Sequence, residues 1–427
     1  MRRRLLLALF ALLLLLLLLA GWLALAGRDD PGPPARTGAF STEQQRSRGA
    51  YLALAGDCMA CHTARGGAAF AGGRLLATPF GAMHTPNITP DRATGLGSWS
   101  ADDFWRALHN GVSKDGRLLY PAFPYTSYTR MPREDSDALY AYLQSLPAIQ
   151  AANAPHQLRF PYNQQILLAG WRALYFRPGV YRADAAKSAE WNRGAYLVQG
   201  PAHCSACHSP RNWLGASEGE SLAGAMLSMQ GWYAPSLTAA DQAGLQRWPQ
   251  EHIVQLLKTG VSGDASVSGP MAEVVSRSLQ HLDDADLRAM AQYLQSLPAS
   301  ASAAPKDGGS SVVLPAFLAA GEKLYTQHCA DCHGSTGRGQ APAYPALAGN
   351  RALTMTATVN PIRMVLNGGF APATAGNPRP YSMPPFGPVL SDMEVAQVLT
   401  YVRASWGNQA APVSASEVNQ YRSVPLD

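Results

Sequence analysis

The chain has 427 residues, of which 47% are hydrophobic and 15% are charged, and this composition excludes a disordered polyelectrolyte. At about 150 residues per domain, the length predicts about three domains. The formal net charge is +5, and Arg2, Arg3 and Arg4 supply three of the positive charges beside an apolar run. The remaining excess is too small to indicate nucleic-acid binding.

The first element in chain order is a targeting segment over residues 1–27. Residues 5–26 are almost entirely apolar and long enough to cross a bilayer, which takes about 20 residues. Arginines 2–4 precede this run, so the positive-inside rule places the rest of the chain outside the cytoplasm. Two interpretations stay open: a retained membrane anchor, and a signal peptide that is cleaved before Gly27. Both predict an exported protein.

The remainder of the chain repeats itself three times, as tandem domains do. The first two copies open with the sequence RGAYL, at Arg48 and at Arg193, and the third opens with AGEKLY at Ala320. Each copy then reaches a Cys-x-x-Cys-His motif and closes on a helical run, which reads YAYLQSLP in the first copy and YLQSLP in the second. Pro147 and Pro298 end these two closing runs.

Acidic or capping residues predict where the closing helices begin. They are Asp102 and Asp103, Asp283 and Asp284, and Ser391 and Asp392. No segment shows the sustained alternation of a strand, so the predicted fold is mostly α. The predicted domains are residues 40–155, 185–299 and 313–410, with linkers at 29–35 and 299–312 and a C-terminal tail at 411–427.

All six cysteines belong to the three Cys-x-x-Cys-His motifs, a pattern typical of covalent c-type haem attachment. Two thiols about one helical turn apart face the same side and can bond both vinyl groups of one porphyrin. The adjacent histidine then lies under the iron as its proximal ligand. Three haem c groups are therefore predicted. Their attachment residues are Cys58, Cys61, Cys204, Cys207, Cys329 and Cys332, and their proximal ligands are His62, His208 and His333.

Two other interpretations of the cysteines are less consistent with the sequence. A structural zinc site needs two Cys-x-x-Cys pairs within about 15–20 residues, and these pairs lie more widely separated. A redox dithiol does not require a histidine after the second cysteine in all three copies. The exported location also suits covalent haem attachment.

The sixth iron ligand in cytochromes c is usually Met or His, and Met raises the reduction potential. Met383, in the sequence YSMPP, and Met271, after Gly269 and Pro270, are the candidates in the third and second copies. An isolated Met is more often a core residue, but the position before the closing helix and the flanking prolines favour ligation.

The first copy departs from this pattern. Phe123 occupies the position of Met271, and a phenylalanine cannot bind iron. Met131 follows shortly before the closing helix and is the predicted sixth ligand of the first haem. Met83, His84, His109 and a five-coordinate iron remain as alternatives.

Together these features resemble the tri-haem cytochrome c subunit of bacterial membrane-bound dehydrogenases, which serves the oxidation of alcohols, gluconate, fructose and aldehydes. The resemblance spans residues 40–410 and is carried by the motifs NITPD at Asn87, YPA at Tyr120, SAEWNRGAYLV at Ser188 and CHSPRN at Cys207. It implies three tandem class I cytochrome c domains behind an N-terminal apolar helix.

The resemblance also implies a function without substrate chemistry in this chain, and no catalytic residue is predicted. A dehydrogenase subunit with a quinone, flavin or molybdenum cofactor would supply electrons, and ubiquinone or a terminal oxidase would accept them. The expected location is the periplasmic face of the bacterial inner membrane, or the periplasm if residues 1–27 are removed. The alternatives are a peroxidase-like haem enzyme with an open iron in the first copy and a free electron-shuttle cytochrome.

Overall fold

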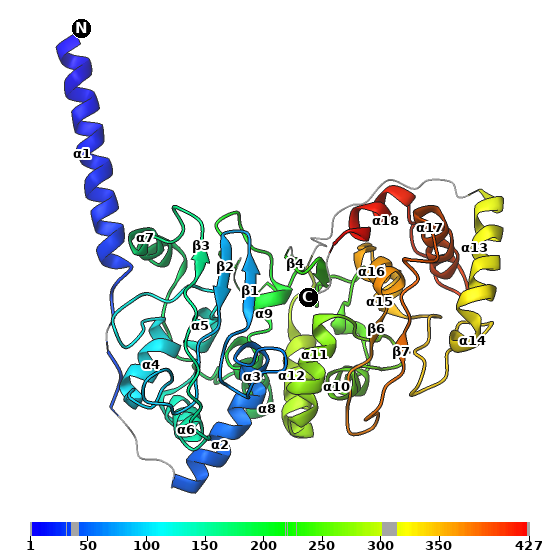
Figure 1. Ribbon diagram of the computed structural model, residues 1–427, viewed down its shortest axis with the longest axis horizontal. Coiled ribbons are helices and arrows are strands. Elements are labelled where there is room, and N and C mark those ends of the chain that lie inside the picture. Colours follow the sequence, from blue (N-terminus) through cyan, green and yellow to red (C-terminus); the bar gives the residue numbers. More distant parts are fainter. Residues whose placement is uncertain are drawn as a thin grey trace. The chain divides into compact units, whose positions relative to one another are not determined.

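The computed structural model describes residues 2–30, 32–35, 42–217, 219, 221–227, 229–300 and 314–424. The second predicted linker, 299–312, lies outside these residues from position 301 onward. The chain divides into two compact units, one made of Met1–Ala53 with Cys61–Arg182 and the other of Leu54–Ala60 with Ala183–Asp427. Helices dominate both units, which confirms the predicted mostly α fold (Figure 1).

Where the structure describes it, the segment 2–182 contains seven helices and one small sheet (Figure 1). The helices are α1 Arg2–Ala26, α2 Thr42–Ala55, α3 Cys58–Cys61, α4 Ala101–Asn110, α5 Tyr125–Tyr128, α6 Arg133–Gln144 and α7 Gln165–Tyr175. The sheet is antiparallel, in the order β1 Leu75–Thr78, β2 Gly81–His84 and β3 Gln157–Leu158.

The second and third copies share one compact unit. The second copy comprises α8 Ala189–Gln199, α9 Ser205–His208, β4 Ala225–Leu227, β5 Trp232–Ala234, the 3₁₀ helix η1 Leu245–Arg247, α10 Gln250–Thr259, α11 Pro270–Arg277, the 3₁₀ helix η2 Leu279–His281 and α12 Asp284–Ser296. The third copy comprises α13 Pro315–His328, α14 Ala330–His333, α15 Arg351–Thr354, α16 Val359–Asn367, β6 Gly369–Phe370, β7 Ser382–Met383, α17 Asp392–Ala404 and α18 Ala415–Arg422.

In every copy the opening helix lies against the closing helix at a glycine. A Cβ atom added to Gly194 of α8 would lie 1.9 Å from the Ala289 carbonyl oxygen of α12. The corresponding distances are 2.0 Å from Gly49 to the Ala138 oxygen and 2.3 Å from Gly321 to the Gln397 oxygen. Because real Cβ atoms do not approach this closely, the repeated glycine is what lets the two helices meet.

The arginine that precedes this glycine explains the rest of the repeated RGAYL sequence. The Arg193 guanidinium donates two hydrogen bonds, of 2.8 and 2.6 Å, to the Asp286 carboxylate in the closing helix. Arg48 forms an ion pair with Asp135 at the equivalent position of the first copy. The third copy has Ala320 at this position and cannot form this ion pair.

Helix starts follow the capping residues, with one correction to the sequence prediction. Asp283 is the N-cap residue of α12, and Ser391 caps α17 through a reciprocal bond with Glu394. Asp103 forms the same kind of capping box with Ser100, but it begins α4. The closing helix of the first copy is α6, which begins later, at Arg133.

The segment expected to be a C-terminal tail contains α18, which packs against the third domain. Val418 of α18 is fully buried with Ile362 of α16 and Val395 of α17. Ser414 caps α18 through a reciprocal bond with Glu417, and Arg422 at its end pairs with Asp392 of α17. Residues 414–422 are therefore part of the third domain's core.

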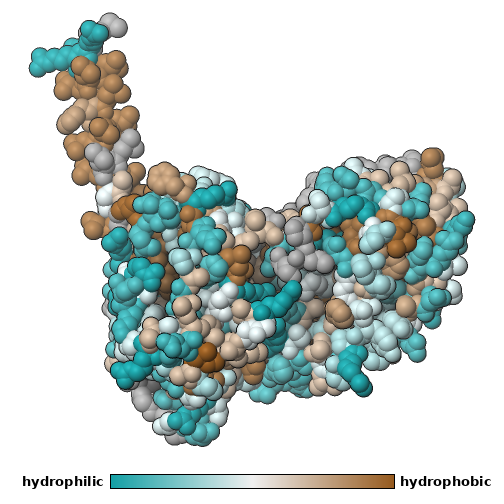
Figure 2. All heavy atoms as spheres, viewed as in Figure 1, coloured by the Kyte–Doolittle hydropathy of each residue, from teal (hydrophilic) through white to brown (hydrophobic). Residues whose placement is uncertain are grey.

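The N-terminal helix α1 is long and apolar enough to cross a membrane over Arg2–Leu23, by length and composition. None of this window is buried inside the protein. Hydrophobic side chains dominate the visible face of the helix (Figure 2), as expected of a segment that lies in lipid or of a signal sequence.

Candidate functional site

Each cysteine pair lies on one short helical turn. Cys58 and Cys61 bound α3, whereas Cys204 and Cys329 stand immediately before α9 and α14. The Cys207 amide donates to the Cys204 carbonyl at 3.3 Å, and the Cys332 amide donates to the Cys329 carbonyl at 3.2 Å. One turn of helix thus brings the two thiols of a motif to the same side, as attachment to one porphyrin requires.

The six motif cysteines are not disulfide-bonded, and their exposure follows the same order in each motif. The first cysteine is half-buried, and the second, Cys61, Cys207 or Cys332, is exposed. Burial, with the Cys332 thiol nearby, raises the pKa of Cys329 to about 11.

The histidine of each motif donates a hydrogen bond from its Nδ1 atom to the carbonyl oxygen of a proline. The Nδ1 atom of His62 donates to the Pro86 carbonyl oxygen at 2.8 Å, and that of His208 donates to the Pro235 oxygen at 2.8 Å. His333 donates to the Pro345 oxygen at 3.0 Å. Because Nδ1 carries the proton in this arrangement, the Nε2 lone pair of each ring is left for an iron atom.

Burial also keeps these three rings neutral. Desolvation lowers the pKa of His62, His208 and His333, and it outweighs the opposing effect of the proline carbonyls. A neutral imidazole is the form that binds a metal. The thiol pairs and the oriented imidazoles therefore form a donor set that fits haem c.

The proline carbonyls were not predicted from the sequence. Pro86 and Pro235 open the repeated segments PNIT and PSLT, so their equivalence is visible in the sequence. Pro345 is separated from His333 by fewer residues of the sequence, and its loop does not contain the repeated segment. Every residue type has a backbone carbonyl, so the residue itself gives no signal for this role. Only a repeated sequence around it can indicate equivalent positions.

Two of the three candidate sixth ligands are partly accessible. Met271 is the second residue of α11, and Met383 lies in β7 opposite Gly369 of β6. Gly368 lies so close to this strand that an added Cβ would be 2.2 Å from the Met383 carbonyl oxygen. Met131, between α5 and α6, is only 2% exposed.

The other candidates of the first copy lie in different surroundings. Phe123 packs its ring against Tyr128, 5.4 Å away. His109 is buried and stacks on Trp105 at 4.4 Å, and burial lowers its pKa. Met83 is buried in β2, and His84 ends that strand.

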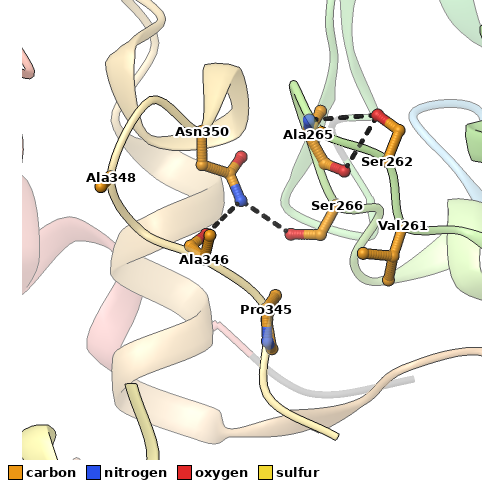
Figure 3. Close-up of a pocket in the computed structure, with 9 residues that line it drawn as sticks. Val261, Ser262, Ala265, Ser266, Pro345, Ala346, Ala348 and Asn350 are labelled. Atoms are coloured by element: carbon orange, nitrogen blue, oxygen red, sulfur yellow. Dashed lines mark hydrogen bonds between the residues drawn. The ribbon is translucent and has the colours of Figure 1, made fainter. Parts of the chain in front are cut away.

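The second and third copies meet at a small pocket lined by residues of both (Figure 3). The side-chain amide of Asn350 donates to the Ser266 hydroxyl at 3.1 Å and to the Ala346 carbonyl at 2.8 Å. Ala346 follows Pro345, whose carbonyl holds His333. The loop that orients the third histidine is therefore bonded directly to the second copy.

Arg351 makes a second connection across this contact. Its guanidinium donates to the Gln242 carbonyl at 2.6 Å, and its amide donates to the Asp264 carbonyl at 2.7 Å. The Gln242 side chain in turn accepts the Ser236 amide at 2.6 Å, next to Pro235. One hydrogen-bonded path thus joins the loops that orient His208 and His333.

Among the described residues, no group of three or more His, Cys, Asp and Glu is placed to hold a metal ion. The cysteine pairs are therefore not brought together into the four-ligand cluster of a structural zinc site.

Comparison with known proteins finds one family repeated along the chain. The family model described as cytochrome c matches three times, over residues 46–147, 192–298 and 318–406. The alcohol dehydrogenase (quinone) cytochrome c subunit of Gluconobacter oxydans is 36% identical over 88% of this chain and 82% of its own length. The gluconate 2-dehydrogenase cytochrome c subunit of Pantoea cypripedii is 38% identical over 88% of this chain and 89% of its own length.

A subunit of the nicotinate dehydrogenase of Pseudomonas putida is 43% identical over 87% of this chain. The chain spans only 31% of that relative's length. The similarity therefore covers most of this chain, and most of that relative has no counterpart in it.

Proposed function

The chain belongs to the cytochrome c family, and from this premise we propose that it carries electrons from a partner dehydrogenase subunit through three covalently bound haems. The proposed electron acceptor is ubiquinone or a terminal oxidase. The proposed location is the periplasmic face of a bacterial inner membrane, with α1 as the anchor or as a signal sequence. The three domains would occupy residues 40–155, 185–299 and 313–410.

The proposed attachment residues are the six motif cysteines, and His62, His208 and His333 are the proposed proximal ligands. Met131, Met271 and Met383 are the proposed sixth ligands. Bound haem iron supplies one-electron chemistry by alternating between its ferrous and ferric states. The chain would contribute the thioether-forming thiols and the orientation of each imidazole.

One observation carries this proposal. Three times, a pair of cysteines on one helical turn is followed by a histidine whose Nδ1 donates a hydrogen bond to a proline carbonyl, at 2.8, 2.8 and 3.0 Å. A structural histidine has no need of the same partner in all three copies. Second interactions of this kind fix the tautomer and the ring orientation of a metal-binding histidine.

The relatives support a dehydrogenase partner because their names describe cytochrome c subunits of alcohol and gluconate dehydrogenases. A cytochrome subunit passes on electrons that a catalytic subunit removes from its substrate. The partner would carry a quinone, flavin or molybdenum cofactor, since these groups accept electron pairs and release single electrons.

The haem content gives the first test. The mature protein should retain the mass of three haems after acid-acetone extraction, because thioether bonds survive that treatment. Cys204→Ala with Cys207→Ala should remove one haem and leave two. Ser205→Ala in the same motif is the control and should keep three. A wild-type mass with fewer than three haems contradicts the count.

The native complex gives the second test. Solubilised membranes should yield this chain together with a large catalytic subunit, and that subunit's substrate should reduce the haem absorbance of the complex. If the chain purifies alone and no substrate reduces it without an added dehydrogenase, a free shuttle cytochrome becomes the better description.

A further inference from the structure

Helix α7 has an unusual distribution of side chains for a surface helix. Its outward face carries Ile166, Leu167, Leu174 and Tyr175, which are 53, 50, 55 and 40% exposed. Gly170 and Trp171 complete the same face by helical periodicity. A surface helix of a soluble protein normally places polar residues outward. This outward face contains no charged residue.

The one charged residue of α7 points inward. Arg172 is buried, 3% exposed, and donates to the Gly27 carbonyl at 2.8 Å and to the Asn110 carbonyl. Leu168 and Ala169 are buried on the same inward side. With apolar residues outside and a satisfied arginine inside, α7 has the composition of a helix that lies at a membrane surface.

The position of α1 beside α7 indicates that a bilayer lies next to this face. The C-terminal end of α1 lies on α7, where Gly27 is so close to Ala169 that an added Cβ would be 1.7 Å from its carbonyl oxygen. Asp30, just beyond, accepts a hydrogen bond from Arg106 of α4 at 2.5 Å. The segment that leaves the candidate membrane helix is thus bonded to the first domain beside α7.

We propose that the outward face of α7 lies in the interfacial region of the same bilayer that α1 enters. Trp171 and Tyr175 are residue types that favour the headgroup level, and Leu167 and Leu174 would reach the acyl chains. The bilayer would then hold the first domain at two places and fix its orientation. This inference rests on the proposed membrane location of α1.

Site-directed nitroxide labelling tests the inference on the full chain. The proposed thioether bonds consume all six native cysteines, so an introduced cysteine is the single free thiol. Labels are placed at Leu167→Cys and Leu174→Cys, and the protein is reconstituted into vesicles of phosphatidylethanolamine and phosphatidylglycerol. Oxygen, which concentrates in lipid, and a water-soluble nickel chelate report the surroundings of each label.

Two further labels are the controls. Leu13→Cys in α1 should report lipid, and Glu43→Cys on α2 should report water, since α2 and α7 lie at opposite ends of this unit (Figure 1). We expect labels 167 and 174 to lose relaxation by nickel and to keep relaxation by oxygen. In a Leu167→Glu, Leu174→Glu variant, a label at Ile166→Cys should move from lipid to water.

Each outcome has one meaning. Labels 167 and 174 in water, with label 13 in lipid, overturn the inference and leave the anchor in place. Label 13 in water overturns the membrane location of α1, whatever the α7 labels report. Labels 167 and 174 shielded from both reagents mean that protein covers this face, and they also overturn the inference.

Discussion

Gly194 of α8 lies against the backbone of Ala289 in α12, so close that a Cβ atom on the glycine would be 1.9 Å from the Ala289 carbonyl oxygen. The next residue toward the N-terminus, Arg193, bonds Asp286 one helical turn earlier in α12. The absence of a side chain at Gly194 and the ion pair of Arg193 with Asp286 thus stabilise the same contact between α8 and α12.

Gly194→Ala should destabilise the second domain. The added methyl group cannot be accommodated without separating the two helices, and such overpacking costs about 1–3 kcal/mol. The melting temperature of the domain should fall by several degrees, measured by circular dichroism. Gly170→Ala in α7 is the matched control, because no atom lies within 4 Å of its added Cβ. The Gly170→Ala variant should be more stable than the wild type by about 0.5–1 kcal/mol, because alanine has a better helix propensity than glycine.

Arg351→Ala should loosen the contact between the second and third domains. The variant loses the guanidinium bonds to Gln242 and Ala240 and keeps the amide bond to Asp264. Hydrogen bonds from charged groups contribute about 1.5–3 kcal/mol, so amides of residues 345–354 should exchange roughly ten to a hundred times faster. Arg338→Ala, at an exposed position of the same domain, should leave their exchange unchanged.

The start of the mature chain distinguishes the two roles proposed for α1, a membrane anchor and a cleaved signal sequence. Gly27, which would follow a signal-peptide cleavage, is buried against α7 and holds Arg172 through its carbonyl. If α1 is a retained anchor, the mature chain should start upstream of Gly27 and stay in the membrane pellet after a carbonate wash. N-terminal sequencing that begins at Gly27, with the protein in the soluble fraction, would show that α1 is a cleaved signal.

The sequence predicts the cysteines and histidines as haem-binding residues because covalent attachment needs a fixed local spacing. The repeated RGAYL sequence also identifies Gly49 and Gly194 as equivalent positions. Their role at the contact between two helices became visible only in the structure. The prediction for Asp103 was wrong, since a capping residue indicates a helix start without saying which helix follows.

Contacts between distant segments could not be predicted from the sequence. Arg351 belongs to no motif, and its role depends on carbonyls more than 100 residues away. The docking of α18 was missed as well, because a short polar helix with one buried valine, Val418, has no strong periodic signal. Such interactions depend on the tertiary arrangement, which local patterns do not contain.

The sixth ligand of the first haem is the most specific prediction for the site. Met131 is 2% exposed and stands just before α6, in the copy where Phe123 replaces the expected methionine. Met131→Leu conserves volume, so the loss of stability should stay below about 1.5 kcal/mol and the domain should remain folded. Its haem should stay attached through Cys58 and Cys61.

If Met131 binds iron, the Leu variant lowers the reduction potential of one haem, because an axial Met raises it. A redox titration should resolve one shifted and two unshifted components. Met271→Leu is the matched control and should shift a different component by the same mechanism. If Met131→Leu leaves all three potentials unchanged while Met271→Leu shifts one, Met131 is a core residue beside α6. The search for the ligand then turns to His109, His84 and Met83.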